Sequence, residues 1–136
     1  MKPWMWSDLS VGKLETCAQP LQDVMNLALK TSPVDMKVLQ GHRSVDEQLS
    51  LYEQGLSKVR VGRHNSSPSE AVDVVPLLKG GGIDWHDRER FFLLAGVIYA
   101  AAEQLGVSLR WGGDWDTDTD YRDQTFIDLV HWELKA

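Results

Sequence analysis

Hydrophobic and polar positions follow two different periods along the chain, and these periods predict helices and strands in turn. Apolar residues recur at helical spacing over residues 21–28 and form a broad apolar face over residues 91–105. Short apolar runs typical of strands lie at residues 36–40, 71–75, 107–111 and 130–134. We therefore predict an α+β fold, in which a small antiparallel sheet of three to four strands packs against helices.

The first half of the chain carries clear signals for where helices begin and end. A helical region is expected over about residues 10–30, with a break near Pro20, because proline suits the first turn of a helix. The sequence SVDE at residues 44–47 is a capping box, which predicts a helix that starts there and runs to Glu53. Gly55 then suits the stop of that helix.

The long apolar helix is bounded by two residues with strong end preferences. Asp84 precedes it and suits the N-cap position, where its carboxylate accepts hydrogen bonds from free backbone N–H groups. Gly106 follows it and suits the left-handed conformation that ends many helices. An Asp-rich loop from Gly112 to Asp123 separates the last two predicted strands.

Length and composition indicate one globular domain over residues 1–136, of which residues 1–9 form a loose leader whose Trp4 and Trp6 could pack on the body. The net charge is −6 and no Lys/Arg cluster is present, so nucleic acid is not an expected partner. Cys17 is the only cysteine, which excludes an intrachain disulfide framework and a cysteine-based zinc site. A metal must therefore be held by histidine and carboxylate.

The N-terminal sequence and the hydropathy of the chain argue against export and membrane insertion. The N-terminus lacks the apolar run of a signal peptide, and no segment reaches the roughly 18 apolar residues of a membrane span. We expect a protein that is made and kept in the cytoplasm until another factor releases it.

Candidate chemistry centres on Asp73, which lies in the middle of a predicted strand where an unpaired carboxylate would be costly. His64 lies nine residues upstream in a loop, and His131 lies in the last predicted strand. Two imidazoles and one carboxylate can hold a catalytic zinc with one position left for water. The alternative is a hydrogen-bonded structural His131 and a solvated His64. We expect neither His42 nor His86 to be needed for the zinc.

Two further acids flank His131. Asp128 lies three residues before it, a spacing that lets a carboxylate reach the attacking water and act as general base. By strand alternation Glu133 points to the same side as His131, so it either orients the imidazole or is a surface carboxylate. Both interpretations of Glu133 stay open at this point.

The Asp-rich loop predicts a second cation site or a solvated acidic surface. Asp114, Asp116, Asp118 and Asp120 alternate with other residues, as at the start of a calcium-binding loop, but the Gly and terminal Glu of an EF-hand are missing. Trp111 and Trp115 flank this stretch, and each could belong to the core or to a substrate-binding wall.

In order along the chain, LQGHRS, HNSSPSEAVDVVP, GIDW, LRWGGDWD and DLVHWEL resemble the phage endolysins that are L-alanyl-D-glutamate peptidases. This family is similar in fold and zinc site to bacterial D-Ala-D-Ala carboxypeptidases and dipeptidases, the hedgehog/DD-peptidase-like scaffold. The resemblance covers about residues 14–135.

The resemblance implies a role for each matching residue. It implies that the zinc ligands are His64, Asp73 and His131. It also implies that Asp128 is the catalytic base. Arg43 matches an arginine that would stabilise the developing oxyanion or hold a substrate carboxylate; the alternative is a surface ion pair. Gln48, one helical turn further on, would be a supporting hydrogen-bonding residue.

The chain departs from the common form of the family motif, S-x-H-x-x-G-x-A-x-D. Gly62 replaces the serine, and the interval from His64 to Asp73 is two residues longer, so that Ser66 occupies the aligned ligand position. His64 is the only histidine of the segment, and we retain it as the expected ligand.

The implied activity is zinc-dependent hydrolysis of the L-Ala–D-Glu bond in the peptidoglycan stem peptide during phage lysis. A pore-forming partner would then give this enzyme access to the wall, and we expect a monomer. Two rival functions are a D-Ala-D-Ala carboxypeptidase or dipeptidase on the same scaffold and a non-catalytic, zinc-stabilised binding module. The net charge of −6 offers no electrostatic steering towards an anionic wall.

Overall fold

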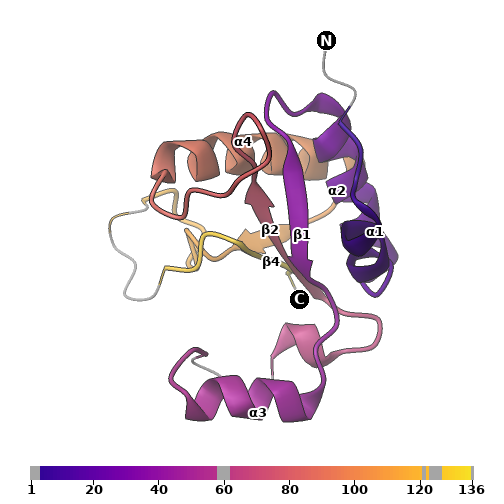
Figure 1. Cartoon of the computed structure of the whole chain (residues 1–136), viewed down its shortest axis with the longest axis vertical. Coiled ribbons are helices and arrows are strands. Elements are labelled where there is room, and N and C mark those ends of the chain that lie inside the picture. Colours follow the sequence, from indigo (N-terminus) through magenta and orange to yellow (C-terminus); the bar gives the residue numbers. More distant parts are fainter. Residues whose placement is uncertain (1–3, 58–61, 121, 123–126, 136) are drawn as a thin grey trace.

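The computed structural model describes residues 4–57, 62–120, 122 and 127–135, and it confirms the predicted α+β class (Figure 1). Its helices are α1 (Asp8–Leu14), α2 (Gln19–Thr31), α3 (Val45–Glu53) and α4 (Arg88–Leu105), with a short 3-10 helix η1 at Arg63–Asn65. Its strands are β1 (Met36–Gln40), β2 (Ala71–Pro76), β3 (Leu109–Trp111) and β4 (His131–Leu134). They form one antiparallel sheet in the order β1-β2-β4-β3.

Strand alternation divides the sheet into a core face and a site face. Val72 pairs with Trp132, and both side chains are buried in the hydrophobic core. The next pair along the strands is Asp73 with His131, which alternation turns to the opposite face. The register of β2 against β4 therefore places a carboxylate directly beside an imidazole.

Helices α1, α2 and α4 supply the core on the first of these faces. Leu21, Val24, Met25 and Ile98 are fully buried there, as the helical spacing of apolar residues predicted. Trp111 and Trp132 stack with ring centroids 5.4 Å apart and close the same core. Helix α3 stands apart from the other helices (Figure 1), and Gln48 is its one buried residue.

Several predicted element ends are confirmed. Strand β1 has the predicted bounds, and Ser44 makes the predicted capping box at the start of α3. Gly55 and Gly106 have φ angles of 75° and 69°, so both adopt the left-handed conformation expected after a helix.

Other ends differ for reasons that lie in tertiary contacts. The first helical region is interrupted as predicted, with Pro20 in the first turn of α2. The interruption covers residues 15–18, where the backbone N–H of Ala18 donates to the carbonyl oxygen of Ser69 in the loop before β2. The N-cap of α4 is Asp87 and not Asp84, which accepts instead from the backbone N–H of His86 within the preceding turn. Helix α1 begins at Asp8, inside the predicted leader.

The segment before α1 is held on the body by its two indoles. The Trp4 Nε1–H group donates to the carbonyl oxygen of Ser32, and the Trp6 Nε1–H group donates to Asn26 Oδ1. Within the ranges given above, no helix combines the length and the apolar character needed to cross a membrane.

Candidate metal centre

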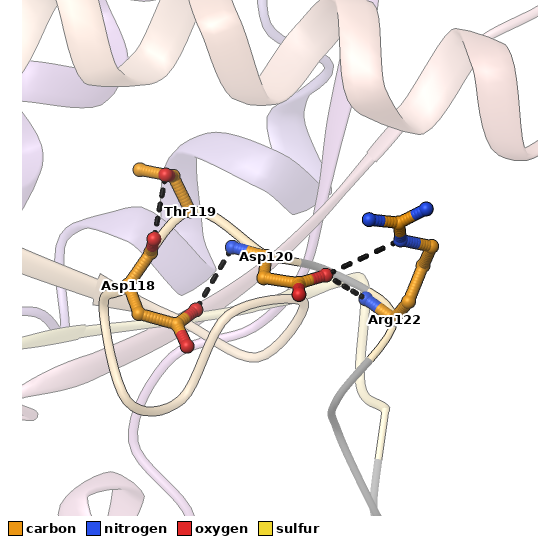
Figure 2. Close-up of a pocket in the computed structure, with 4 residues that line it drawn as sticks. All are labelled: Asp118, Thr119, Asp120 and Arg122. Atoms are coloured by element: carbon orange, nitrogen blue, oxygen red, sulfur yellow. Dashed lines mark hydrogen bonds and ion pairs between the residues drawn. The ribbon is translucent and has the colours of Figure 1, made fainter.

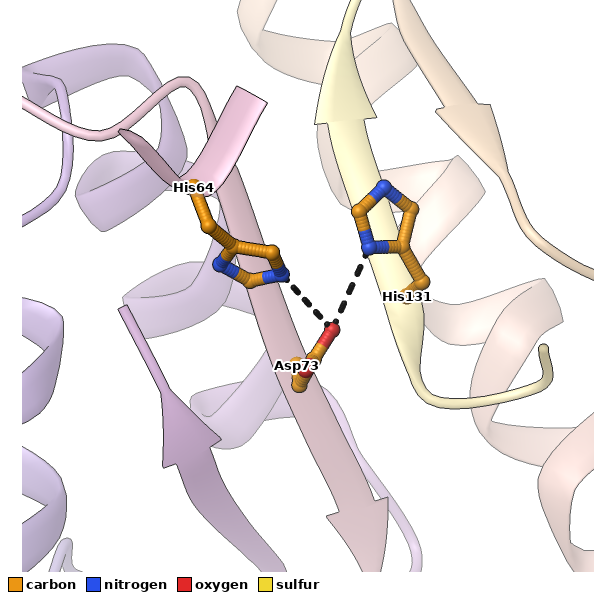
Figure 3. Close-up of side chains that lie close together, drawn as sticks. All are labelled: His64, Asp73 and His131. Carbon is orange, nitrogen blue, oxygen red and sulfur yellow. Dashed lines mark hydrogen bonds and ion pairs between the residues drawn. The ribbon is translucent and has the colours of Figure 1, made fainter. Parts of the chain in front are cut away.

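Three separate segments bring His64, Asp73 and His131 together on the site face of the sheet (Figure 3). His64 lies in η1, Asp73 in β2 and His131 in β4. Asp73 Oδ1 lies 3.1 Å from His64 Nε2 and 3.3 Å from His131 Nδ1. The three ligand atoms all lie within 4.8 Å of one another, so the group could hold a metal ion.

The remaining ring nitrogens have acceptors that fix the tautomer of each imidazole. His64 Nδ1 lies 2.7 Å from the carbonyl oxygen of Gly41, and His131 Nε2 lies 2.8 Å from Glu133 Oε1. A carbonyl or carboxylate oxygen only accepts, so these two nitrogens carry the protons. The nitrogens that face Asp73 are His64 Nε2 and His131 Nδ1. Each can carry a proton and donate it to the Asp73 carboxylate, or lose that proton and offer a lone pair to a metal ion.

Charge is concentrated and buried around Asp73. Burial alone would raise the pKa of Asp73, but hydrogen bonds from His131 and His64 outweigh burial and hold this pKa well below its ordinary value. Burial alone would lower the pKa of His131, but its bonds to Asp73 and Glu133 raise it to about 9. Protons and a metal ion therefore compete for the same nitrogen of His131.

Arg43 lies beside Asp73 and is held there by the buried side chain of Gln48. Its Nη2 lies 3.6 Å from Asp73 Oδ2, and its Nη1–H group donates to Gln48 Oε1 over 2.8 Å. Gln48 in turn donates from Nε2 to the hydroxyl of Ser57. The predicted arginine and its predicted hydrogen-bonding partner are thus brought together at the centre.

Asp128 lies at the start of the turn that leads into β4. Its backbone N–H donates to the carbonyl oxygen of Gly112, and the backbone N–H of His131 donates to the carbonyl oxygen of Asp128. Burial and the negative charge of Asp73 raise the pKa of the Asp128 carboxyl. A carboxyl with a raised pKa is better suited to accept and return a proton.

The two tryptophans around the acidic loop have different roles. Trp111 is 1% exposed and belongs to the core. Trp115 is half-buried, and its ring centroid lies 5.3 Å from that of His131. The sequence did not decide whether each tryptophan belongs to the core or to a substrate-binding wall. In the structure, Trp115 is the one of the two that lies beside His131.

Two functional candidates, Arg63 and Arg110, were missed at the sequence level. Arg110 Nη2 lies 2.8 Å from Glu133 Oε2, and Arg63 Nε lies 3.7 Å from the same oxygen. Strand alternation in β3 and β4 would have placed Arg110 and Glu133 on one face, but only the register makes them neighbours.

Comparison with known proteins decides the family. A family model of phage L-alanyl-D-glutamate peptidases matches residues 3–135. The chain belongs to this family. It is a peptidase, and the resemblance drawn from its motifs is confirmed.

Two relatives support this assignment. The peptidase is 33% identical over 116 residues to the L-alanyl-D-glutamate peptidase of Escherichia phage T5, covering 85% of this chain and 84% of that protein. It also matches the crystal structure of the Serratia marcescens L-Ala D-Glu endopeptidase ChiX with a TM-score of 0.79 and 28% identity. That match covers 98% of this chain and 92% of ChiX.

The lengthened motif of the peptidase still brings His64 to Asp73. Ser66, which the shorter motif would align with the ligand, instead donates from its hydroxyl to Glu70 Oε2. The carbonyl oxygen of Ser66 lies 2.9 Å from Nδ1 of the exposed His42. His86 is exposed and precedes α4, so neither of the other two histidines joins the group.

The acidic loop of the peptidase divides into two parts. Carboxylate oxygens of Asp114, Asp116 and Asp118 lie within 4.8 Å of one another and form a second group that could hold a cation. Asp120 is outside this group and pairs with Arg122 at 3.4 Å. Figure 2 shows Asp120 with Asp118, Thr119 and Arg122 around a pocket.

Proposed function

We propose that this peptidase hydrolyses the L-Ala–D-Glu bond of peptidoglycan stem peptides, with zinc held by His64, Asp73 and His131. The observation that carries the proposal is the convergence of two imidazoles and one carboxylate in a member of this family. This donor set fits zinc, since neutral imidazole and carboxylate oxygen are ordinary zinc ligands and a fourth position stays open. When bound, zinc would lower the pKa of a water molecule and polarise the scissile carbonyl.

Asp128 is the proposed general base. It accepts the proton of the attacking water and returns it to the leaving amine of D-Glu, so that the amide bond breaks as the new carboxyl group forms. The raised pKa of its carboxyl supports this role, because the same group must first take up a proton and then release it.

Arg43 is proposed to act on negative charge in the substrate. Its guanidinium would stabilise the developing oxyanion or bind a substrate carboxylate, and its bond to Gln48 would keep it in position. Glu133 is proposed to orient His131 through the bond to Nε2, which keeps Nδ1 available as a ligand.

A calcium ion is the proposed occupant of the acidic loop, held by Asp114, Asp116 and Asp118. Asp114 Oδ1 is buried and has no hydrogen-bond partner within the described residues, so it is suited to a cation. Asp120, which pairs with Arg122, is left as an outer residue of this loop.

The proposed biological role is host-cell lysis by a phage. The enzyme would be made in the cytoplasm and would act as a monomer once a pore-forming partner admits it to the wall. This setting rests on the family and on the phage T5 relative.

An Asp128→Asn variant tests the proposed chemistry. We expect it to keep its fold and bound zinc and to lose hydrolysis of purified peptidoglycan by a factor on the order of 10²–10⁴. Asp23→Ala, at an exposed carboxylate on α2, serves as control and should retain full activity. Unchanged hydrolysis by Asp128→Asn would overturn the mechanism, and a wild-type protein that binds zinc without hydrolysis would favour a binding module.

A further inference from the structure

A buried ion-pair network lies directly behind His131, on the side away from Asp73. Glu133 is only 6% exposed and contacts three cationic or hydrogen-bonding groups. Its Oε1 faces His131 Nε2 at 2.8 Å, whereas its Oε2 faces Arg110 Nη2 at 2.8 Å and Arg63 Nε at 3.7 Å. The two oxygens of one carboxylate thus have separate partners.

The sheet register creates this arrangement. Arg110 in β3 is the direct cross-strand partner of Glu133 in β4, and it binds Oε2 through both Nε and Nη2. On the other side of Glu133 the partner in β2 is Ala71, whose small side chain leaves room above the strand. Arg63 reaches Glu133 from η1, where it immediately precedes His64.

Arg63 also connects the network back to the start of β2. Its Nη1–H group donates to Glu70 Oε1 over 2.9 Å while its Nε faces Glu133. One side chain therefore spans the segments that carry His64 and His131. The positive charges of Arg63 and Arg110 balance the negative charges of Glu70 and Glu133, so these four side chains together carry no net charge.

We infer that Arg63 and Arg110 are positioning residues that clamp Glu133 and thereby set which nitrogen of His131 binds the metal. With Oε2 held by both arginines, Oε1 is the acceptor presented to His131. An acceptor at that point requires the proton on Nε2 and leaves the lone pair on Nδ1, which faces Asp73. The inference rests on the proposed role of His131 as a metal ligand.

The same clamp fixes the distance between the two histidine ligands. Arg63 directly precedes His64 in the sequence and forms an ion pair with Glu133, which lies two residues after His131. Loss of either arginine would leave Oε2 with one cationic partner in place of two, and the Glu133 carboxylate would be held less firmly against the imidazole. The metal site would then bind zinc less tightly although all three ligands remain.

Zinc affinity, measured by competition with a chromophoric chelator, tests the inference without reference to catalysis. We expect Arg63→Gln and Arg110→Gln each to weaken zinc binding by about 10-fold to 100-fold. Arg110→Lys should recover part of that loss because it restores one positive charge beside Oε2. Arg90→Gln is the matched control, since Arg90 is also paired with an acid and is 30% exposed, close to the 28% of Arg63.

Several outcomes decide between a positioning role and a purely structural one. Zinc affinities of both variants within twofold of wild type, with melting temperatures lowered as in Arg90→Gln, would overturn the inference. ¹⁵N spectra of the zinc-loaded wild-type enzyme give an independent test should a variant not fold. A proton on His131 Nε2 supports the clamp, and a proton on Nδ1 contradicts it. A wild-type protein that binds no zinc would instead refute the proposed function itself.

Discussion

The backbone of Gly112 passes against Asp128 with no room for a side chain between them. A Cβ atom on Gly112 would lie 2.0 Å from the carbonyl oxygen of Asp128 and 3.0 Å from its Cβ atom. The same glycine accepts from the backbone N–H of Asp128 and donates to the carbonyl oxygen of His131. Gly112 therefore sets the position of the proposed base relative to a proposed metal ligand.

Gly112→Ala should displace Asp128 and reduce hydrolysis at least tenfold. The overlap involves backbone atoms, so we also expect a loss of about 1–3 kcal/mol in the free energy of unfolding. Gly96→Ala is the control, because a Cβ at exposed Gly96 in α4 meets no atom within 4 Å. Turnover of peptidoglycan and chemical denaturation measure both effects, and a Gly112→Ala enzyme with wild-type activity would show that this contact is dispensable.

The metal-free protein should lose stability as pH rises from about 6.5 to about 9. The pKa of His131 is raised from 6.5 to about 9 in the folded protein, so the folded state keeps a proton that the unfolded state releases. This contribution is fully present below pH 6.5 and is lost as pH rises through 9. Its slope is at most about 1.4 kcal/mol per pH unit.

Denaturation of EDTA-treated protein between pH 6.5 and 8.5 measures this slope, and His131→Gln should remove it. Titrating groups that lie away from His131 remain in that variant and contribute to the slope of both proteins. Equal slopes in the two proteins would show that His131 is not the linked group.

Several features were predictable because they depend on local sequence. The bounds of β1, the capping box at Ser44 and the placement of Glu133 beside His131 all follow from neighbours along the chain. Strand alternation also turned Asp73 towards the site face once β2 was recognised.

The features that escaped prediction depend on pairing between distant segments. The contact of Arg110 with Glu133 arises from the β3–β4 register. A break was predicted near Pro20, but its exact place is set by the bond between Ala18 and the carbonyl oxygen of Ser69. Asp84 and Asp87 are both suitable caps by residue type, and only the path of the turn before α4 selects Asp87. Residue preferences carry no information about such long-range registers.

Trp115 should contribute to substrate binding, since its half-buried ring lies beside His131. We expect Trp115→Ala to raise KM about tenfold, which corresponds to about 1.4 kcal/mol of binding free energy, with a smaller change in kcat. Trp85→Ala is the control, because Trp85 is 54% exposed and stacks on Phe91. Steady-state kinetics on a soluble muropeptide would contradict this role if the two variants had the same KM.

The acidic loop should respond to calcium through Asp114, Asp116 and Asp118. After chelation and reloading with zinc alone, we expect added calcium to raise the melting temperature by several degrees, as for a ligand that binds only the folded state. The double variant Asp116→Asn/Asp118→Asn should lose this response, whereas Asp46→Asn, at an exposed acid on α3, should keep it. A wild-type melting temperature and activity that ignore calcium would exclude a calcium site.

Mass spectrometry of purified Gram-negative peptidoglycan after digestion, with EDTA treatment and zinc add-back, tests most directly whether this peptidase cuts the L-Ala–D-Glu bond with a bound zinc. We expect free stem peptides that begin at D-Glu, produced by the native and zinc-restored enzyme and absent after chelation. Release of terminal D-Ala instead would assign the enzyme to carboxypeptidase chemistry on this scaffold. Peptides beginning at D-Glu that persist without any metal would contradict the proposed role of His64, Asp73 and His131.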